Sequence, residues 1–411
     1  MRGGGQAAVR SAPWSVAALA LLLAPSPATA QLGGSTMARG LIASVPFEFV
    51  GNRILIQVTV DSSGPLTYVF DTGGAGGPLL NARTARRLGI GGSDTLQGVG
   101  FSGQAPVVRS RGHTVRVGPL RFDDMGVGLL DMDHIERAEG RPIDGIIGGP
   151  LLSRYAVRID FDSARLEFYD NRRFTYEPGG RRLDVEVISG SVAVLDATAT
   201  FDEGSRFAGR LILDSGSPGT ALFNARFAAR TGILDRVTSL CETAAAGASS
   251  RTVPVRWVMP QDFAFGGFRT GTIPAAVAVP QPQERFRPQS DGTMGLDVLG
   301  RFNVLIDIRH RRVFLEPNGV RSEPLGPPCS GVSLATDTTF QRILVDRVYE
   351  GSPAREAGLE PGDEIVSVGG RAASDLTIQG VRRMLRGEWT EMEMFVSRRG
   401  EARTVVLRRT E

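Results

Sequence analysis

Apolar and polar residues alternate with a period of two over much of the chain, which is the pattern of strands with one buried face. In the first half the alternation runs through residues 47–50 and 54–60, and residues 67–70 form a third, more apolar stretch after a turn at residues 62–64. The pattern therefore predicts a body built mainly of short β-strands.

Short helices are predicted at two places within this body. The first covers residues 81–88, because Asn81 is a favourable N-cap and Gly89 stands just beyond the last helical residue. The second copy has the same signals, with Asn224 as the cap and Gly232 as the stop. The two helices thus occupy equivalent places in the two halves of the chain.

The chain contains a long internal repeat. Residues 70–90 laid on residues 213–233, at a shift of 214 − 71 = 143, give eleven identical pairs among 21 positions. The stretch that begins at Asp144 matches the stretch that begins at Asp291, at a shift of 291 − 144 = 147. Because the shifts differ by only 147 − 143 = 4 residues, whole lobes of roughly 145 residues are duplicated, a period far longer than that of solenoids or propellers.

Each copy carries an Asp-(Thr/Ser)-Gly turn at the end of an apolar strand, at residues 71–73 and 214–216. A mostly apolar segment that ends in glycine begins 146 − 71 = 75 residues after the first aspartate and 293 − 214 = 79 residues after the second. This pairing resembles the two lobes of a pepsin-like or retropepsin-like aspartic protease, over about residues 44–317. The resemblance implies a mainly β fold in which two duplicated β-barrel lobes form a central cleft.

By that resemblance Asp71 and Asp214 form the catalytic pair of an aspartic endopeptidase with polypeptide substrates. Two carboxyls within hydrogen-bonding distance cannot both ionise readily, so the pair holds one proton. One member can then activate a water while the other protonates the scissile carbonyl. This chemistry requires no cofactor and no metal. The alternative is that each aspartate merely caps a tight turn, and the matched pair favours the catalytic interpretation.

The neighbours of the two aspartates have roles implied by the same resemblance. The hydroxyls of Thr72 and Ser215 cross-link the two turns and keep the pair rigid. Gly73 and Gly216 let the backbone pass close to the carboxyls.

The residue after each turn differs between the copies: the first has Gly74 and the second has Ser217. Similar enzymes usually have a hydroxyl residue at both positions, where it donates a hydrogen bond to the catalytic carboxylate. On this ground Ser217 favours Asp214 as the ionised member of the pair.

The glycine-rich residues 98–103 are a candidate for the hairpin tip that closes over a bound peptide. The tip lacks the tyrosine found in pepsin, so Phe101 is the candidate for its stacking role. A mobile surface hairpin without a role in substrate binding is the alternative.

The composition changes after residue 317, where proline and glycine become frequent, and a new unit begins near residue 331. Residues 351–370 resemble a PDZ domain of the kind that accompanies bacterial proteases. Such domains bind peptide C-termini by adding a strand to a sheet edge, and some only pack against their neighbours. The carboxylate loop implied by the resemblance is Gly331, Val332, Ser333 and Leu334.

Local signals in this unit agree with the resemblance. Ser352 caps a short helix with Pro353 in its first turn, residues 364–368 alternate as a strand, and a helix is predicted at about residues 375–385. The predicted organisation is a signal peptide at 1–30, one protease lobe at 31–178, a second lobe at 179–320, a linker at 321–330 and a PDZ domain at 331–411.

The first thirty residues have the pattern of a secretory signal, with arginines before the apolar run 16–24 and a small-residue cleavage site at 28–30. No later apolar run is long enough to span a bilayer. These features predict an exported protein, periplasmic or secreted. In an oxidising compartment Cys241 and Cys329 either form a disulfide or remain separate thiols, and their spacing favours neither alternative.

The formal net charge of +3 comes from 47 cationic residues, all of them arginine, scattered among 44 acids. No basic run indicates nucleic-acid binding. A serine protease is disfavoured, since the absence of lysine excludes a Ser-Lys dyad and no serine motif accompanies His113, His134 or His310. The competing interpretation is a catalytically inactive peptide-binding or adaptor protein of the same fold. The sequence makes no prediction of an oligomeric state.

Overall fold

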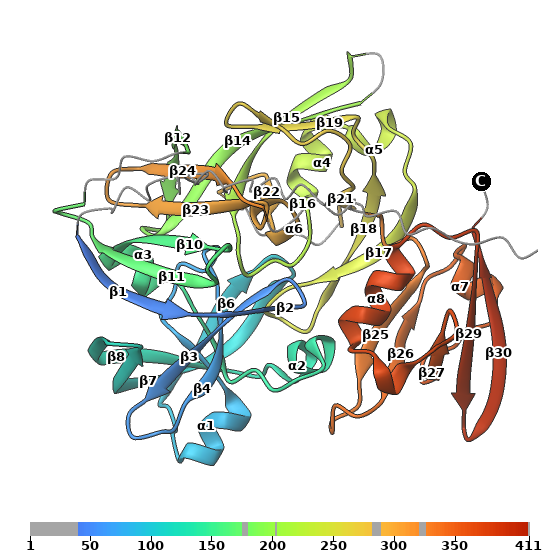
Figure 1. The fold of residues 1–411 in the computed structure, drawn as a ribbon, viewed down its shortest axis with the longest axis horizontal. Coiled ribbons are helices and arrows are strands. Elements are labelled where there is room, and N and C mark those ends of the chain that lie inside the picture. Colours follow the sequence, from blue (N-terminus) through green and yellow to red (C-terminus); the bar gives the residue numbers. More distant parts are fainter. Residues whose placement is uncertain (1–39, 175–179, 202–203, 282–288, 320–325, 410–411) are drawn as a thin grey trace, which may run out of the picture. The chain divides into compact units, whose positions relative to one another are not determined.

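The computed structural model describes residues 40–174, 180–201, 204–281, 289–319 and 326–409. The predicted signal peptide and the first half of the predicted linker, residues 321–325, lie outside these residues. The described chain is mainly β, as predicted, with four sheets and short helices (Figure 1). None of the helices in the described part has the length and apolar character that a membrane span requires.

The first lobe is an eight-stranded sheet with the order β2-β3-β4-β9-β5-β8-β7-β6, and a further pairing of β3 with β7 curls it on itself. Its helix α1 (Ala82–Leu88) begins and ends as predicted, with the Asn81 side chain accepting from the backbone N–H of Arg83 and Gly89 in the left-handed conformation. The strands are β2 (Glu48–Val50), β3 (Arg53–Val60), β4 (Leu66–Phe70), β5 (Leu79–Asn81), β6 (Asp94–Gly100), β7 (Gly103–Val117), β8 (Leu120–Leu130) and β9 (Gly145–Ile147).

The second lobe has a ten-stranded sheet with the order β17-β18-β21-β16-β22-β15-β14-β19-β20, and β13 pairs with β14. Its helix α4 (Ala225–Thr231) is capped by Asn224 and ends at Gly232, as predicted. The strands are β13 (Glu186–Ile188), β14 (Val192–Thr200), β15 (Arg206–Leu213), β16 (Ala221–Phe223), β17 (Cys241–Ala246), β18 (Thr252–Val258), β19 (Asp262–Phe265), β20 (Phe268–Arg269), β21 (Ala275–Ala278) and β22 (Gly292–Met294).

The pairings around the two aspartates repeat from lobe to lobe, which confirms the predicted duplication. In the first lobe β4 pairs in parallel with β9, and β5 lies antiparallel on the other side of β9. In the second lobe β15 pairs in parallel with β22, and β16 lies antiparallel on its other side. In the sheet orders given above, β4 lies between β3 and β9, and β15 lies between β22 and β14. Each strand that leads to an aspartate is therefore a central strand, fixed on both edges by hydrogen bonds.

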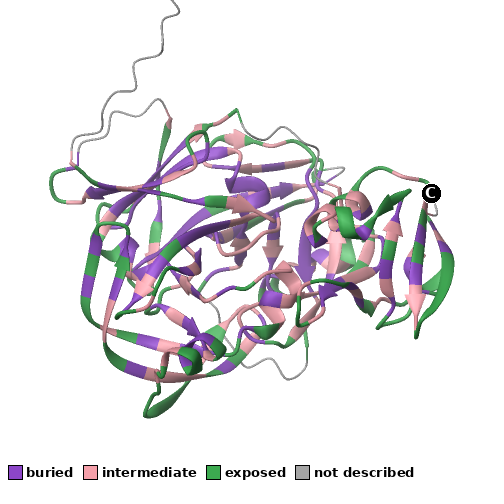
Figure 2. Cartoon of the chain, turned by 60° about the horizontal axis from the view of Figure 1, so that its bottom comes forward, coloured by how far each residue is buried: buried purple, intermediate pink, exposed green. Residues whose placement is uncertain are grey.

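A third sheet is shared by the two lobes, because β10 of the first pairs with β23 of the second. Its order is β1-β11-β10-β23-β24-β12. Burial runs through these sheets (Figure 2), and residues of both lobes contribute to one continuous hydrophobic cluster. The strands are β1 (Leu41–Pro46), β10 (Tyr155–Asp160), β11 (Arg165–Asp170), β12 (Arg181–Asp184), β23 (Phe302–Asp307) and β24 (Arg312–Pro317).

Four further helices connect the strands of the two lobes. Helix α2 precedes β9, α3 and α6 each follow one of the glycine-ending segments, and α5 follows α4 directly. They are α2 (Asp133–Glu139), α3 (Gly149–Arg154), α5 (Ile233–Arg236) and α6 (Leu296–Leu299).

The C-terminal domain has its own sheet, β25-β26-β27-β29-β30 with β28 beside β27, and its own hydrophobic cluster. The predicted Ser352 cap and the predicted strand at 364–368 are confirmed. The predicted helix at 375–385 starts too early, because Thr377 caps it from Ile378 onward. The elements are β25 (Val332–Thr336), β26 (Ile343–Val348), α7 (Pro353–Glu356), β27 (Glu364–Val368), β28 (Arg371–Ala372), η2 (Ala373–Asp375), α8 (Ile378–Arg386), β29 (Glu391–Arg398) and β30 (Glu401–Arg408).

Cys241 and Cys329 form a disulfide, with their Cα atoms 5.6 Å apart. The bond joins β17 of the second lobe to the segment just before β25, and decides between the two alternatives that the sequence leaves open. The loop that it closes spans 88 residues. Cross-linking so long a loop restricts the unfolded chain and stabilises the folded one by roughly 4.6 kcal/mol in the chain-entropy model.

Candidate active site

Two buried strands carry the aspartates to the same place. Strand β4 ends at Phe70 and β15 ends at Leu213, both fully buried. The backbone N–H of Asp71 donates to the carbonyl of Ile147 at 2.9 Å, and that of Asp214 donates to Met294 at 3.0 Å. The two apolar segments singled out in the sequence therefore lie beside the turns and fix the backbone of each aspartate.

The two turns are cross-linked by a reciprocal set of hydrogen bonds. The Thr72 hydroxyl donates to the Leu213 carbonyl at 2.6 Å and accepts from the Ser215 N–H at 2.9 Å. The Ser215 hydroxyl donates to the Phe70 carbonyl at 2.8 Å and accepts from the Thr72 N–H at 3.0 Å. Both hydroxyls are buried, so the four bonds are shielded from water and hold the turns in register.

The glycines of the turns leave room for the carboxyl of the opposite lobe. A Cβ on Gly73 would stand 2.7 Å from Cγ of Asp214, and a Cβ on Gly216 would stand 2.5 Å from Cγ of Asp71. No side chain fits at such distances. The two carboxyls lie close enough to hydrogen-bond to each other.

The surroundings of the carboxyls differ. Burial raises the pKa of both, and the negative charge of Asp71 raises the pKa of Asp214 further, well above its usual range. The Asp71 carboxylate accepts from the backbone N–H of Gly73 at 2.8 Å and of Gly74 at 3.1 Å, and the hydrogen bond from Asp214 also lowers its pKa. These bonds favour Asp71 as the ionised member and Asp214 as the member that holds the proton.

This assignment reverses the one that Ser217 favours in the sequence. The Ser217 side chain points to Gly295, where a Cβ would stand 2.9 Å from the Ser217 hydroxyl. In the described structure no hydrogen bond joins that hydroxyl to the Asp214 carboxyl. At the equivalent place in the first turn, the backbone N–H of Gly74 makes the contact with the carboxylate that a side chain was expected to make.

The glycine-rich hairpin is present between β6 and β7, where Gly100 pairs with Gly103. Its tip contacts the second lobe: the Ser102 hydroxyl lies 2.8 Å from the Ser249 hydroxyl and accepts from the Gly247 N–H at 3.0 Å. Phe101 packs against an apolar cluster built around β18 and β21 of that lobe. The tip thus joins the two lobes in this structure.

The turn between β2 and β3 also reaches the Asp214 turn, which the sequence does not indicate. Arg53 donates from Nη1 to the Gly216 carbonyl, and Asn52 donates from Nδ2 to the Pro218 carbonyl at 2.9 Å. These partners lie 163 and 166 residues apart in the chain. Neither residue belongs to a motif or to the segments that match between the two copies, so no signal in the sequence predicts these contacts.

In the C-terminal domain, Gly331 precedes the edge strand β25 with a φ of +79°, while Val332, Ser333 and Leu334 lie within that strand. The strand therefore starts earlier than expected, and only Gly331 lies in a loop. The edge is occupied near its end: Arg382 of α8 donates to the Leu334 carbonyl at 2.7 Å. Arg137 of α2 donates to the Thr336 carbonyl at 2.9 Å.

His113 lies between a serine and an aspartate, an order that the sequence did not indicate. Its Nε2 is 2.7 Å from the Ser110 hydroxyl and its Nδ1 is 2.7 Å from the Asp61 carboxylate. Ser110 is buried, and its hydroxyl donates to the Gly91 carbonyl at 2.5 Å, so its proton is engaged in a contact with the backbone. Within the described residues, no group of His, Cys, Asp and Glu side chains is arranged to hold a metal ion.

Two family models match the chain. One, described as aspartyl protease, matches residues 56–151, and the other, described as PDZ domain, matches residues 344–396. Among solved structures the aspartic proteinase from Irpex lacteus is similar, with 16% identity and a TM-score of 0.41 over 67% of this chain and 97% of that chain. The comparison with curated proteins gave no match. The chain thus carries an aspartyl-protease-like body and a C-terminal PDZ domain.

Proposed function

We propose that this chain, with its aspartyl-protease-like body and PDZ domain, is an aspartic endopeptidase. Asp71 and Asp214 together form the site at which it hydrolyses peptide bonds of its substrates. The observation that carries the proposal is that the carboxyls of Asp71 and Asp214 each lie against the glycine of the opposite turn, while the reciprocal bonds of Thr72 and Ser215 hold the two turns together. A turn-capping role for each aspartate does not explain why two copies meet. It also does not explain why each opposing glycine has no room for a side chain.

In this mechanism the Asp71 carboxylate takes a proton from water as the water oxygen attacks the scissile carbonyl carbon. Asp214 donates its proton to the carbonyl oxygen, which gives a neutral tetrahedral diol. The C–N bond then breaks as Asp71 passes its proton to the leaving nitrogen, and Asp214 recovers a proton from the diol. Both carboxyls end in their starting states, so one water is consumed and no covalent intermediate forms.

The test is inhibition by a statine-containing peptide, whose hydroxyl occupies the place of the attacking water in such a site. We expect cleavage of an unfolded protein substrate to stop in proportion to the bound inhibitor. Cleavage that continues with the inhibitor bound would place the hydrolysis at another site. Inhibitors of serine proteases and of metalloproteases would then show which class of site is responsible.

The second candidate is a peptide-binding protein that does not cut, and the tip of the glycine-rich hairpin at residues 98–103 favours it. Ser102 is hydrogen-bonded to the second lobe, and a peptide must displace this contact to enter the cleft. This candidate predicts binding of the statine peptide without cleavage of any substrate. Ser102→Ala distinguishes the two candidates. An enzyme whose cleft is closed by the Ser102 contact gains activity in this variant, whereas a binding protein remains inactive.

We further propose that the PDZ domain binds peptide C-termini at the edge of β25. The Arg382 guanidinium bonded to Leu334 occupies part of that edge, so a peptide competes with it. Arg382→Ala is expected to tighten the binding of peptides with free C-termini, and amidated peptides serve as the negative control. Arg383→Ala, an exposed arginine on the same helix, is the matched control. Equal binding of free and amidated peptides by every variant would contradict this use of the edge.

We also propose that the protein is exported after cleavage behind Ala30. The pattern of the first thirty residues supports this, and so does the disulfide, which persists in oxidising compartments. N-terminal sequencing of the exported protein is expected to begin at Gln31. A mature protein that retains Met1 inside the cell would contradict the proposal.

A further inference from the structure

The tip of the β2–β3 hairpin, defined here as residues 51–53, donates hydrogen bonds to the backbone of the Asp214 turn. Arg53 donates to the carbonyl of Gly216, two residues after the aspartate, and Asn52 donates to Pro218, two residues further on. Asn52 adopts the left-handed conformation with a φ of 58°, which aims its amide across the lobes. The tip therefore fixes two carbonyls of the Asp214 turn, and the Gly216 N–H of the same turn bonds to the Asp214 carboxyl.

Arg53 is itself held from behind by a buried carboxylate. Its Nε donates to Oε1 of Glu139 at 2.9 Å, and the Glu139 side chain is only 7% exposed. Oε2 of Glu139 accepts from the Gln379 amide of α8 at 3.1 Å. A buried carboxylate that accepts from both sides orients the guanidinium firmly. Helix α8 of the PDZ domain is thus connected to the Asp214 turn through two side chains.

A second chain of contacts runs parallel to the first. Asn52 also donates to Oδ1 of Asp297, a residue that is 4% exposed, and Oδ2 of Asp297 pairs with Arg386 of α8 at 3.1 Å. Between the two chains, a Cβ on Gly51 would stand 2.8 Å from the Gln379 side chain, so α8 rests directly on the hairpin tip. The same helix therefore supports both residues that hold the turn.

The charged groups around Arg53 come from four elements. Glu139 of α2 and the two aspartates are its anionic neighbours, and Arg382 of α8 is the other cation nearby. The cation lowers the pKa of Asp71 and of Asp214, against the effect of burial. The Asp71 turn lies in the lobe that supplies the hairpin, and the described structure gives it no corresponding arginine.

We propose that Arg53 is a positioning residue of the catalytic pair, and that helix α8 of the PDZ domain keeps it on the Asp214 turn through Glu139. The proposal rests on the proposed function of the pair. It assigns the PDZ domain a second role, as a fixed part of the frame that supports one catalytic turn. A cavity of about 430 Å³ lies beside this contact and is lined by Arg53, Glu139 and Gln379.

The test compares Arg53→Met with Arg53→Lys in the full chain, by the pH dependence of kcat. Loss of the cation raises both pKa values, so we expect both limbs of the Arg53→Met profile to move to higher pH. Loss of its hydrogen bonds lowers kcat at the optimum by about tenfold. Arg53→Lys keeps the charge, so its limbs stay in place while kcat falls. A purely structural role lowers activity equally in both variants and moves neither profile.

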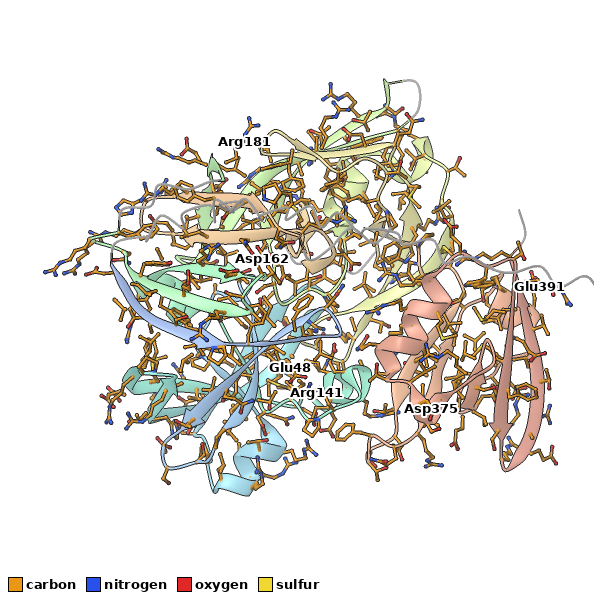
Figure 3. The ribbon with its side chains drawn as sticks, viewed as in Figure 1. Glu48, Arg141, Asp162, Arg181, Asp375 and Glu391 are labelled. Atoms are coloured by element: carbon orange, nitrogen blue, oxygen red, sulfur yellow. A yellow bond between two sulfur atoms is a disulfide. The ribbon has the colours of Figure 1, made fainter. Side chains whose placement is uncertain are left out.

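The matched control is Arg141→Met, which removes an arginine of the same face. Arg141 pairs with Glu48 at 2.8 Å at the surface (Figure 3), and neither contacts the turn. We expect its profile to match the parent protein. An Arg53→Met profile that also matches the parent would overturn the proposal.

The PDZ part is tested by Gln379→Leu, which removes the donor to Glu139 and keeps the size of the side chain. We expect a loss of kcat of about threefold, smaller than that of Arg53→Met, with unchanged circular dichroism. Unchanged kcat in Gln379→Leu together with a shifted Arg53→Met profile would remove the PDZ domain from the proposal. Residual cleavage after loss of Asp71 or Asp214 is a separate result, which contradicts the proposed function and not the position of Arg53.

Discussion

The turns at Asp71 and Asp214 have the same backbone contacts and different surroundings. Each aspartate follows a buried strand, bonds to the segment beside it and faces a glycine of the other copy. Asp71 accepts two backbone N–H bonds at one oxygen. In contrast, the negative charge of Asp71 raises the pKa of Asp214, and Arg53 donates a hydrogen bond to the Gly216 carbonyl in the Asp214 turn. Duplication thus supplies the symmetric frame, and contacts that differ between the two copies make the two carboxyls unequal.

Among changes that leave both carboxyls in place, the largest effect is expected when the frame loses the space between the turns. Gly216→Ala puts a Cβ 2.5 Å from Cγ of Asp71, so one turn must move. We expect kcat/KM to fall about a hundredfold or more, because small displacements of catalytic groups are costly. Gly76→Ala is the control, since nothing lies within 4 Å of its Cβ. Equal activity of the two variants would show that the turns do not meet in the active protein.

The hydroxyls that cross-link the turns come next. Thr72→Ala removes the donor to Leu213 and the acceptor for Ser215, and leaves both groups buried. We expect a loss of about 2–4 kcal/mol in the free energy of unfolding, measured by urea denaturation, with reduced cleavage. Thr72→Ser and Ser215→Thr exchange the residues of the two copies and keep the hydroxyls. If the hydroxyls account for the cross-link, both exchange variants have a free energy of unfolding close to that of the parent. A large loss of stability in either variant would show that side-chain packing matters more than the hydroxyl.

A smaller effect separates the two positions that follow the turns. The Cβ of Gly74→Ser stands 3.2 Å from Oδ2 of Asp71, close enough for its hydroxyl to donate to the carboxylate. Such a bond lowers the pKa of Asp71, so we expect the acidic limb of the pH-rate profile to move to lower pH. Ser217→Ala leaves that limb in place, because the Ser217 hydroxyl points elsewhere. A shift in Ser217→Ala alone would restore Asp214 as the ionised member.

The smallest effect concerns the Ser110–His113–Asp61 contact. Ser110→Ala is expected to leave proteolysis within about twofold of the parent, since the hydroxyl is buried and donates to a carbonyl. Fluorophosphonate labelling of the intact protein is expected to give no adduct at this residue. Labelled Ser110, or loss of cleavage in the variant, would indicate a second hydrolytic centre.

Features that repeat in the chain could be read from the sequence. Local sequence patterns predict the helix caps Asn81 and Asn224, the mainly β fold and the duplicated lobes, because short-range interactions determine these features. The contacts of Arg53 and Asn52 could not be predicted, since they join residues more than 160 positions apart and occur once.

Predictions made from resemblance needed more correction. Ser217 suggested a side-chain hydrogen bond to Asp214, but in the described structure its hydroxyl lies beside Gly295 instead. The PDZ edge strand begins at Val332, within the expected loop. The disulfide was open because spacing alone does not show whether two cysteines meet. In each case the outcome depended on packing between distant segments.

The most direct test of the catalytic pair is to measure cleavage and thermal stability of Asp214→Asn against pH. We expect cleavage to fall about a thousandfold or more at every pH, since no proton donor remains for the carbonyl. The raised pKa of Asp214 means that the pair stabilises the fold less as pH rises through that pKa, so the variant should unfold at a higher temperature than the parent near neutral pH. Cleavage within tenfold of the parent, with a lower unfolding temperature, would contradict the shared-proton pair.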